Sequence, residues 1–356
     1  MTRPRFHPLR VAVVRALAAD AVTLGFAVPA ALRDAYRFRP GQYLTLRATV
    51  AGRDVRRSYS ICSGLDDDTL RVGIKRVEGG VFSTWACSEL RAGATIAVMT
   101  PDGRFGLPPA DGGRVVAAFA AGSGITPVLS IMKTLLAREP DSRFFLFYGN
   151  RSTDSIMFRS EIEDLKDHYM TRLSVFHVLS REQQDVPALN GRLDADMVRL
   201  LLRSLLPVAS VDEALICGPE PMIEGLPIVL LDLGLPRDRV HVERFTPAVV
   251  AAGRSTPVAA AAEYGGVVEA ISDGVRSVFP VAAGEAIIDA AIRAGRSLPF
   301  SCKGGMCCTC RAKVLEGRVE MAVNYSLEPW ETRAGYVLTC QAHLVTARVV
   351  VDYDQV

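Results

Sequence analysis

The sequence predicts three successive domains: an antiparallel β-barrel, an α/β domain with a parallel sheet, and a smaller third domain. The chain has 356 residues, more than the roughly 100 to 200 residues of one compact domain. About the first hundred residues contain short β-rich runs separated by turn signals, and the following part alternates apolar strands with helices. A cysteine-rich stretch near the C-terminus marks the third domain.

Residues 1–109 are expected to form the barrel. β-Rich runs such as "QYLTLRATV" and "TLRVGIKRV" are separated by turn sequences such as "RPGQ" and "PDGR". Regular turns between short strands are typical of an antiparallel barrel. The N-terminal stretch is basic and then apolar, but Arg15 interrupts the apolar run and no small-residue cleavage site follows. We therefore interpret this stretch as a strand and not as a signal peptide.

Residues 110–245 are expected to form the α/β domain. "RVVAAFAA" predicts a buried strand, "TPVLSIMKTLLARE" a helix and "RFFLFYGN" the next strand. Such alternation indicates a parallel sheet covered by helices on both faces. Residues 246–263 are rich in Ala and Pro and have no periodicity, which is typical of a linker. Residues 264–356 then form the third domain.

Composition and charge exclude several classes of function. The net charge is +2 and the isoelectric point is about 8.1, so no strong field favours nucleic acid as a partner. No segment approaches the roughly 18 uninterrupted apolar residues of a membrane span. We expect a cytoplasmic protein, and in a reducing compartment a tight group of cysteines points to metal or redox chemistry rather than to disulfides.

Four of the eight cysteines lie within the nine residues 302–310. Cys302, Cys307 and Cys310, followed by Cys340, have the plant-type spacing of four thiolate ligands for a [2Fe–2S] cluster. Gly304 and Gly305 lie inside the loop, where glycine lets the chain wrap closely around the cluster. A zinc site would more often show two C-x2-C pairs, and unligated structural cysteines are a further alternative.

The loop and its surroundings resemble the plant-type ferredoxin family over residues 264–356. The stretch before the loop resembles the ferredoxin hairpin and helix, and "VLTCQAHLVTARVVVDY" resembles its last ligand and closing strand. This resemblance implies an α+β domain of the β-grasp type. Cys308 departs from the family pattern because ferredoxins usually have a small residue there, and we interpret it as a thiol that does not bind the cluster.

"RRSYSICS" in the barrel resembles the R-x-Y-S motif of the ferredoxin–NADP reductase superfamily. The resemblance implies that Arg57 pairs with a flavin phosphate, that Tyr59 packs against the flavin ring, and that Ser60 approaches the ring near N5. A guanidinium suits phosphate geometry, and a flat aromatic ring suits a flat cofactor. Taken alone, the motif is equally compatible with ordinary barrel surface.

A second segment, "KRVEGGVFSTW", resembles the next flavin-binding segment of the same superfamily. It implies that Gly80, Ser83 and Thr84 bring backbone N–H and hydroxyl groups to the flavin phosphates. Lys75, at the start of the segment, is also expected to bind the cofactor. The members of the superfamily that this sequence resembles use FAD, so FAD is expected rather than FMN, although no adenosine site is evident in the sequence.

"AAGSGITPVLS" follows a predicted strand and opens a predicted helix, where Gly122, Gly124 and Thr126 would present backbone donors to a pyrophosphate. The pattern is G-x-G-x-x-P and lacks the last glycine of Rossmann dehydrogenases. "YGNR" and "CGPEPM" resemble the later nucleotide segments of the reductase superfamily.

The end of the predicted α/β domain supplies the expected residues around the nicotinamide. By resemblance, Cys217 lies near the nicotinamide, with Gly218 and Pro219 beside it, although a buried strand cysteine is the alternative. The acidic and then aromatic ending "HVERF" resembles the family's domain end, which lies over the flavin, and this resemblance implies that Glu243 and Phe245 are near the nicotinamide site. The expected catalytic residues are Tyr59, Ser60, Cys217 and Glu243.

The choice of nucleotide rests on "LSRE". Ser180 and Arg181 follow a predicted strand at the position where the superfamily's NADP-users hold the 2′-phosphate, and Arg151 adds a second charge. NADPH is therefore the expected nucleotide, and NADH is the alternative. If Arg181 is only a solvated loop residue, this argument for NADPH does not apply.

Together, the three predicted domains and their order resemble the reductases of phenylacetyl-CoA epoxidases, a family of multicomponent oxygenases. The resemblance implies an oxidoreductase that passes electrons from NADPH through FAD and a [2Fe–2S] cluster to an oxygenase component, as in phenylacetate degradation. A reductase for another oxygenase or for a hybrid-cluster-type redox protein would use the same domains. A simple flavin reductase would not need the cysteine domain, and a non-enzymatic metal-binding module would leave the flavin and nucleotide segments unexplained.

Overall fold

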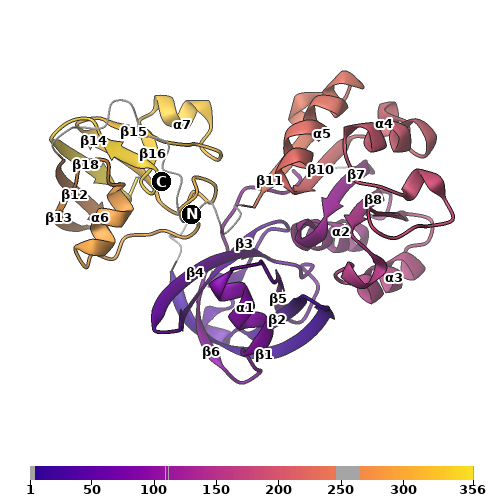
Figure 1. The fold of residues 1–356 in the computed structure, drawn as a ribbon, viewed down its shortest axis with the longest axis horizontal. Coiled ribbons are helices and arrows are strands. Elements are labelled where there is room, and N and C mark those ends of the chain that lie inside the picture. The colour runs from indigo at the N-terminus through magenta and orange to yellow at the C-terminus, as the bar shows by residue number, and fades with distance from the viewer. Residues whose placement is uncertain (1–4, 109, 111, 246–264, 356) are drawn as a thin grey trace. The chain divides into compact units, whose positions relative to one another are not determined.

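The computed structural model describes residues 5–108, 110, 112–245 and 265–355 (Figure 1). These residues divide into two compact units, one ending at Phe245 and one in the C-terminal part of the chain. The predicted linker at 246–263 lies outside the described residues. Among the helices described, none is long and apolar enough to cross a membrane.

The first part of the N-terminal unit is an antiparallel half-barrel, as the turn-separated β-rich runs predict. Its sheet has the strand order β4-β3-β6-β1-β2-β5, and all neighbouring strands are antiparallel. Alternating side chains such as Leu44 and Leu46 point into one apolar core, where Phe82 of the helix packs against them. The elements are β1 (Phe6–Ala18), β2 (Ala21–Ala27), β3 (Tyr43–Val50), β4 (Arg53–Ser60), β5 (Leu70–Lys75), α1 (Val81–Ser88) and β6 (Thr95–Met99).

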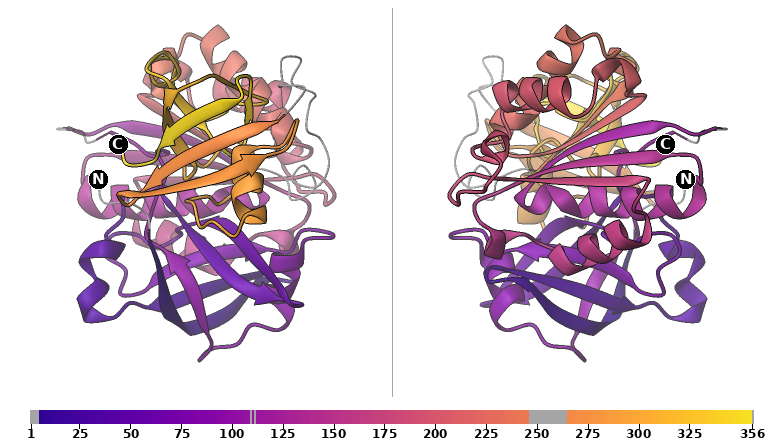
Figure 2. Two further views of the ribbon diagram at one scale, coloured as in Figure 1. Left: turned by 90° about the vertical axis from the view of Figure 1, so that its left-hand side faces the viewer. Right: turned by 90° about the vertical axis from the view of Figure 1, so that its right-hand side faces the viewer.

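The second part is a parallel five-stranded sheet in the order β11-β10-β7-β8-β9. Separate apolar cores lie on its two faces, and Figure 2 shows helices on both sides of the strands. The order of connection reverses between β7 and β10, and ligands of such sheets bind at this switch point. The elements are β7 (Val115–Ala121), α2 (Ile125–Arg138), β8 (Arg143–Asn150), α3 (Arg159–His168), β9 (Leu173–Leu179), α4 (Ala195–Ser204), β10 (Glu213–Gly218), α5 (Glu220–Asp232) and β11 (Val240–Arg244).

The half-barrel and the parallel sheet pack closely within this unit. A side chain at Gly73 in β5 would come within 2.7 Å of Thr126 and 2.9 Å of Phe158, so only glycine allows this approach. The Ser130 hydroxyl in α2 donates to the carbonyl of Ser63 at 2.6 Å. The carboxyl edge of the parallel sheet is therefore held against the barrel.

Four charged side chains reinforce the same packing. Arg71 of β5 lies 3.0 Å from Asp67 and 2.7 Å from Glu161 of α3. Lys133 of α2 contacts the same two carboxylates, Asp67 at 2.6 Å and Glu161 at 2.7 Å. The side chains are 14% to 26% exposed, so each charge is partly desolvated and has opposite charges as neighbours. We call these residues the four-charge network.

The C-terminal unit is a mixed α+β fold with the main sheet order β13-β12-β18-β14-β16. Its first strand, β12, pairs in parallel with its last strand, β18, and α6 packs in the same apolar core. The cysteine-bearing loop lies between α6 and β14. The elements are β12 (Gly266–Ser272), β13 (Val275–Val281), α6 (Ile287–Arg293), β14 (Arg311–Glu316), β15 (Val319–Met321), α7 (Pro329–Arg333), β16 (Tyr336–Leu338), β17 (Ala342–Leu344) and β18 (Arg348–Asp352).

Candidate functional site

The loop before β14 and the turn after β16 carry the four cysteines predicted to ligate the cluster. Cys310 is 2% exposed and Cys340 is 6% exposed, and thiols so buried have little contact with water. The backbone N–H of Gly304 donates to the sulfur of Cys302 at 3.3 Å, and the Gln341 amide donates to the sulfur of Cys340 at 3.8 Å. Donors of this kind stabilise the negative sulfur atoms of an iron–sulfur centre.

The four thiols are arranged as two pairs. The neighbouring Cys307 thiol, aided by backbone N–H groups, lowers the pKa of Cys302 to about 7 even though burial opposes this. The Cys310 thiol in the same way lowers the pKa of Cys340. Charge interactions also connect the two pairs, because Cys340 acts on Cys302 and Cys307 acts on Cys310. The structure thus brings the four cysteines together, and their binding of a [2Fe–2S] cluster remains a prediction.

Cys308 lies between two predicted ligands in an unusual backbone conformation. Its φ angle is +53°, and that of Lys303 is +52°. Non-glycine residues adopt this left-handed region rarely and at a cost, which indicates that the loop shape is imposed by its surroundings. The carbonyl of Cys308 accepts a hydrogen bond from the N–H of Arg311 at 2.9 Å. That Cys308 does not ligate the cluster remains a prediction.

A buried ion pair next to the loop was not anticipated from the sequence. Arg311 follows Cys310 directly, and its Nε lies 2.8 Å from a carboxylate oxygen of Glu331, whose side chain is 0% exposed. The guanidinium also lies 3.6 Å from the ring centroid of Tyr336. The partners are separated by 20 positions in sequence, so no local pattern identifies them.

The flavin motif lies on β4, an edge strand of the half-barrel. Arg57 pairs across the strands with Leu46, and Tyr59 pairs with Leu44. Tyr59 packs against Phe82 with ring centroids 5.7 Å apart, and burial raises the pKa of its hydroxyl. The Arg57 guanidinium donates to the Arg56 carbonyl at 2.7 Å, and no carboxylate in the described part of the chain forms an ion pair with it. A partly buried cation with this environment fits a phosphate.

The second flavin segment forms the start of α1. The Ser83 hydroxyl accepts from the N–H of Val77 at 3.1 Å and donates to the Gly80 carbonyl at 3.4 Å. This hydroxyl therefore closes the preceding turn, and the exposed Thr84 and the backbone remain for an anion. Lys75 lies 3.6 Å from Asp20. Contact of these residues with a flavin remains a prediction.

The glycine turn and the cysteine strand meet at the switch point of the parallel sheet. A side chain at Gly124 would lie 2.0 Å from the carbonyl oxygen of Cys217, so glycine is required there. Gly122 has a φ angle of +54°, and the Thr126 hydroxyl donates to the Ser123 carbonyl at 2.9 Å. The sequence placed these two segments more than 90 positions apart, and the structure brings them into contact.

Cys217 lies at the centre of this junction. It is fully buried, and burial together with the charge of Glu243 raises its pKa well above the ordinary value. Glu243 is its register partner on β11, and Phe245 packs against the apolar core that contains Cys217. Pro219 begins the next turn as the N-cap of α5. The thiol therefore remains protonated, and the expected nicotinamide residues of β10 and β11 lie together.

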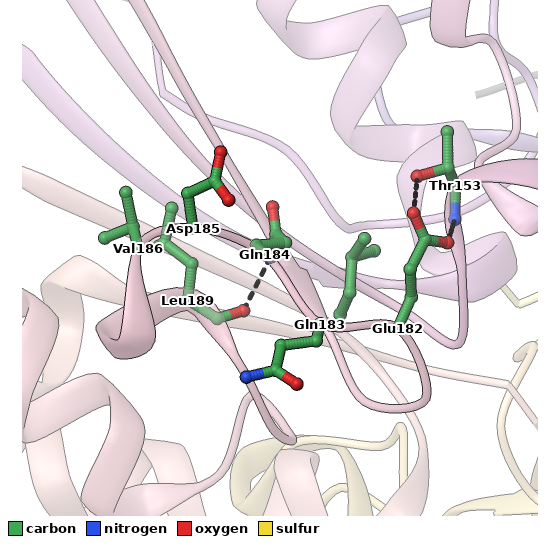
Figure 3. A pocket seen from close by; sticks show the side chains of 8 residues that line it. Thr153, Glu182, Gln183, Gln184, Asp185, Val186 and Leu189 are labelled. Atoms are coloured by element: carbon green, nitrogen blue, oxygen red, sulfur yellow. Dashed lines mark hydrogen bonds between the residues drawn. The ribbon is translucent and has the colours of Figure 1, made fainter.

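The predicted 2′-phosphate residues lie at the carboxyl ends of β8 and β9. The N–H of Ser180 donates to the carbonyl of Asn150 at 3.0 Å, and the N–H of Arg181 donates to the carbonyl of Arg151 at 2.8 Å. Arg151 and Arg181 are exposed. Next to them Glu182, which the sequence did not single out, accepts two hydrogen bonds from Thr153 (Figure 3).

Comparison with known proteins identifies three domains in this chain. Family models for an oxidoreductase FAD-binding domain, an oxidoreductase NAD-binding domain and a 2Fe-2S iron-sulfur cluster binding domain match residues 8–106, 119–227 and 270–345. The chain is 47% identical to a component protein of the 1,2-phenylacetyl-CoA epoxidase of Escherichia coli (strain K12), over 98% of both chains.

More distant relatives share the same architecture. The ferredoxin reductase component of 3-ketosteroid-9-alpha-monooxygenase from Rhodococcus rhodochrous is 35% identical over 97% of this chain and 96% of its own. The solved structure of phthalate dioxygenase reductase, at 21% identity, covers 98% of both chains with a TM-score of 0.61. The likeness to that structure concerns the fold.

Proposed function

The chain belongs to the family of FAD- and NAD(P)H-binding reductases that carry a [2Fe–2S] domain and pass electrons to oxygenases, and we propose that it serves a phenylacetyl-CoA epoxidase with electrons from NADPH. The observation that carries this proposal is the end-to-end identity of 47% to the epoxidase component, which spans all three cofactor domains. The match covers 98% of both chains, so it includes every domain that a partner could contact.

The cofactors supply the redox chemistry: a flavin accepts a hydride and releases single electrons, and a [2Fe–2S] cluster carries them onward. The residues of this chain position the reactants. Arg57 is proposed to neutralise a flavin phosphate, and Tyr59 with Phe82 behind it to cover the ring. At the switch point, glycine at position 124 lets the turn after β7 approach the Cys217 carbonyl closely, and this edge of the sheet is proposed to bind the nucleotide.

Cys217 and Glu243 are proposed to border the nicotinamide. The Cys217 thiol is uncharged because burial and the neighbouring carboxylate oppose its ionisation. A neutral, buried thiol excludes water and does not compete as a nucleophile. Phe245 adds an apolar side chain at the same end of the sheet. These residues orient the nicotinamide and keep the site dry.

NADPH is the proposed nucleotide because two exposed arginines lie together where the 2′-phosphate is expected. The backbones of Arg151 and Arg181 are joined by a hydrogen bond of 2.8 Å. Among the described residues, neither arginine has a carboxylate within ion-pair distance. A phosphate dianion suits two adjacent guanidinium groups. We also propose the cytoplasm as the site of action, since the four clustered thiols must stay reduced to bind iron.

A second acceptor is favoured by one observation. The 35% identity to a 3-ketosteroid-9-alpha-monooxygenase reductase component extends over 97% of the chain, so a reductase for a different oxygenase has the same three domains. The difference between the two functions lies in the partner and not in the electron path.

Reconstitution tests the proposal. The full-length protein with NADPH, the oxygenase component of a phenylacetyl-CoA epoxidase and phenylacetyl-CoA should form epoxide with matching NADPH consumption. NADPH oxidation by a small artificial acceptor without any epoxide formation would contradict the assigned partner. Cys340→Ser should retain reduction of the small acceptor and lose epoxidation, and if it still drives the oxygenase, electrons leave from the flavin and not from the cluster.

A further inference from the structure

Glu182 and Thr153 join the two loops that follow β8 and β9. One carboxylate oxygen of Glu182 accepts from the Thr153 N–H at 2.7 Å, and the other accepts from the Thr153 hydroxyl at 2.6 Å (Figure 3). Thr153 begins the 3-10 turn Thr153–Ser155, so the carboxylate also caps the first N–H of this turn. We call this pair of contacts the Glu182–Thr153 clamp.

The clamp continues a series of contacts that begins in the sheet. Residues 150 and 179 are paired at the last position of the parallel ladder. Beyond it, backbone hydrogen bonds join Ser180 to Asn150 and Arg181 to Arg151, and the clamp follows next. These successive contacts keep the two loops parallel beyond the end of the sheet. They therefore hold the two arginines of the proposed phosphate site next to each other.

The clamp also occupies the carboxylate that is closest in sequence to this site. Hydrogen bonds from the Thr153 hydroxyl and N–H lower the pKa of Glu182, so it is ionised at neutral pH. In the described part of the chain, Glu182 forms no ion pair with an arginine. A carboxylate following Ser180 and Arg181 would otherwise be able to neutralise a guanidinium or bond to a ribose hydroxyl, as acidic residues do in NAD-binding sites.

We propose that the Glu182–Thr153 clamp is a specificity-determining device that favours NADPH by holding Arg151 and Arg181 together and by keeping the Glu182 carboxylate away from the ribose. The inference rests on the proposed use of NADPH. Glu182 and Thr153 are positioning residues, since they act through the arginines and need no contact with the nucleotide.

Two substitutions at Glu182 distinguish the effect of its hydrogen bonds to Thr153 from the effect of its negative charge. Glu182→Ala and Glu182→Gln both remove one negative charge near the expected phosphate. Only Glu182→Gln retains the contacts, because its amide oxygen accepts from the Thr153 N–H and its NH2 donates to the Thr153 hydroxyl. Thr153→Val removes the hydroxyl donor without changing any charge.

The ratio of kcat/KM for NADPH to that for NADH is the measurement, made on the full-length holoenzyme with a small artificial acceptor. Glu182→Ala should lower the ratio about tenfold and Thr153→Val about threefold, since hydrogen bonds to a charged group are lost. Glu182→Gln should stay within about twofold of the natural protein. The NADH value should change little in all three, which also shows that the variants are folded.

A control and a binding measurement complete the test. Asp232→Asn removes another exposed carboxylate of the same sheet domain, which contacts Arg199 at 2.8 Å, and should leave the ratio unchanged. Calorimetry with 2′,5′-ADP and with 5′-ADP should show weaker binding of the first ligand alone in Glu182→Ala. This result would place the effect at the 2′-phosphate.

Three outcomes would overturn the inference, and one of them reports on the proposed function separately. A higher NADPH ratio in Glu182→Ala would mean that Glu182 acts only as a repelling charge. An unchanged ratio in Glu182→Ala and Thr153→Val would remove the clamp while leaving the NADPH proposal intact. A natural protein that prefers NADH would overturn the NADPH proposal, and the clamp as a selectivity device with it.

Discussion

The cysteine loop and the nucleotide edge of the parallel sheet are both sites for a redox group, but they are built in opposite ways. Three of the four predicted cluster ligands lie within nine residues of one loop, and the fourth, Cys340, lies 30 positions later in the turn after β16. The nucleotide edge is assembled from the ends of β7, β8, β9 and β10, which span about a hundred positions. One site is therefore determined by a local loop, and the other depends on the register of a parallel sheet.

The two sites also differ in burial. Three of the four predicted ligands are buried and Cys302 is half-buried, whereas Arg151 and Arg181 are exposed at the edge of the sheet. Water cannot easily take the place of a buried cysteine ligand, so loss of one cysteine should abolish binding of the cluster. An exposed arginine contributes a graded and salt-dependent effect. The comparison predicts all-or-none behaviour for the first site and graded behaviour for the second.

The largest expected effect is at the cysteines. Replacing Cys302, Cys307, Cys310 or Cys340 by Ser should each abolish the cluster, because a thiolate ligand is lost from a pair. Cys308→Ser should retain it. Iron content and visible absorbance of the purified variants provide the measurement. Loss of the cluster in Cys308→Ser, or retention in any of the other four, would show that the ligand set is different.

The next effect concerns the contact that joins the distant parts of the nucleotide edge. Gly124→Ala would place a carbon 2.0 Å from the carbonyl oxygen of Cys217, and backbone atoms cannot move aside easily. We expect a loss of about 3 kcal/mol in the free energy of unfolding and a raised KM for NADPH. The control is Gly225→Ala in α5, where an added carbon meets no atom within 4 Å. Equal stability of the two variants would contradict the observed contact.

A smaller effect is expected at the flavin motif. Arg57→Ala removes a cation that lacks an ion pair among the described residues, and a charge-assisted bond contributes about 1.5 to 3 kcal/mol. The variant should bind flavin about ten- to a hundredfold more weakly and keep its cluster. Flavin retained after dilution and gel filtration is the measurement. Arg53→Ala, at the exposed start of the same strand, should retain flavin, and full retention in Arg57→Ala would remove the phosphate role.

The sequence predicted the features that depend on local sequence better than those that depend on tertiary packing. The fold class and the spacing of the cysteines were predictable, because turn signals, strand and helix alternation and ligand spacing are local properties. The resemblance assigned Gly124 and Cys217 to the same nucleotide site, but their direct contact was not predicted. The buried pair of Arg311 and Glu331 and the Glu182–Thr153 clamp were not predicted, since each joins side chains from different elements whose distance depends on tertiary packing. The hydroxyl of Ser83 likewise serves the turn before α1, which no motif indicates.

The smallest expected effect tests whether the nucleotide edge depends on its packing against the barrel. Lys133 and Arg138 both lie on α2 and both reach carboxylates of the loop before β5. Lys133 is 14% exposed and bonds to Asp67 and Glu161, whereas Arg138 is 52% exposed and pairs with Asp66. Lys133→Met should lower the free energy of unfolding by about 1 kcal/mol, because Arg71 still neutralises both carboxylates.

Arg138→Met, the matched change at the exposed pair, should have no measurable effect on unfolding, because water and salt already screen its charge. Denaturant unfolding monitored by flavin fluorescence, at low and at high salt, measures both variants. The difference between them should persist at high salt, since the four-charge network is partly shielded from solvent. If the two variants lose equal stability, or if salt removes the difference, the network adds no more than a surface ion pair. The close packing at Gly73 and the Ser130–Ser63 hydrogen bond would then align the nucleotide edge with the barrel.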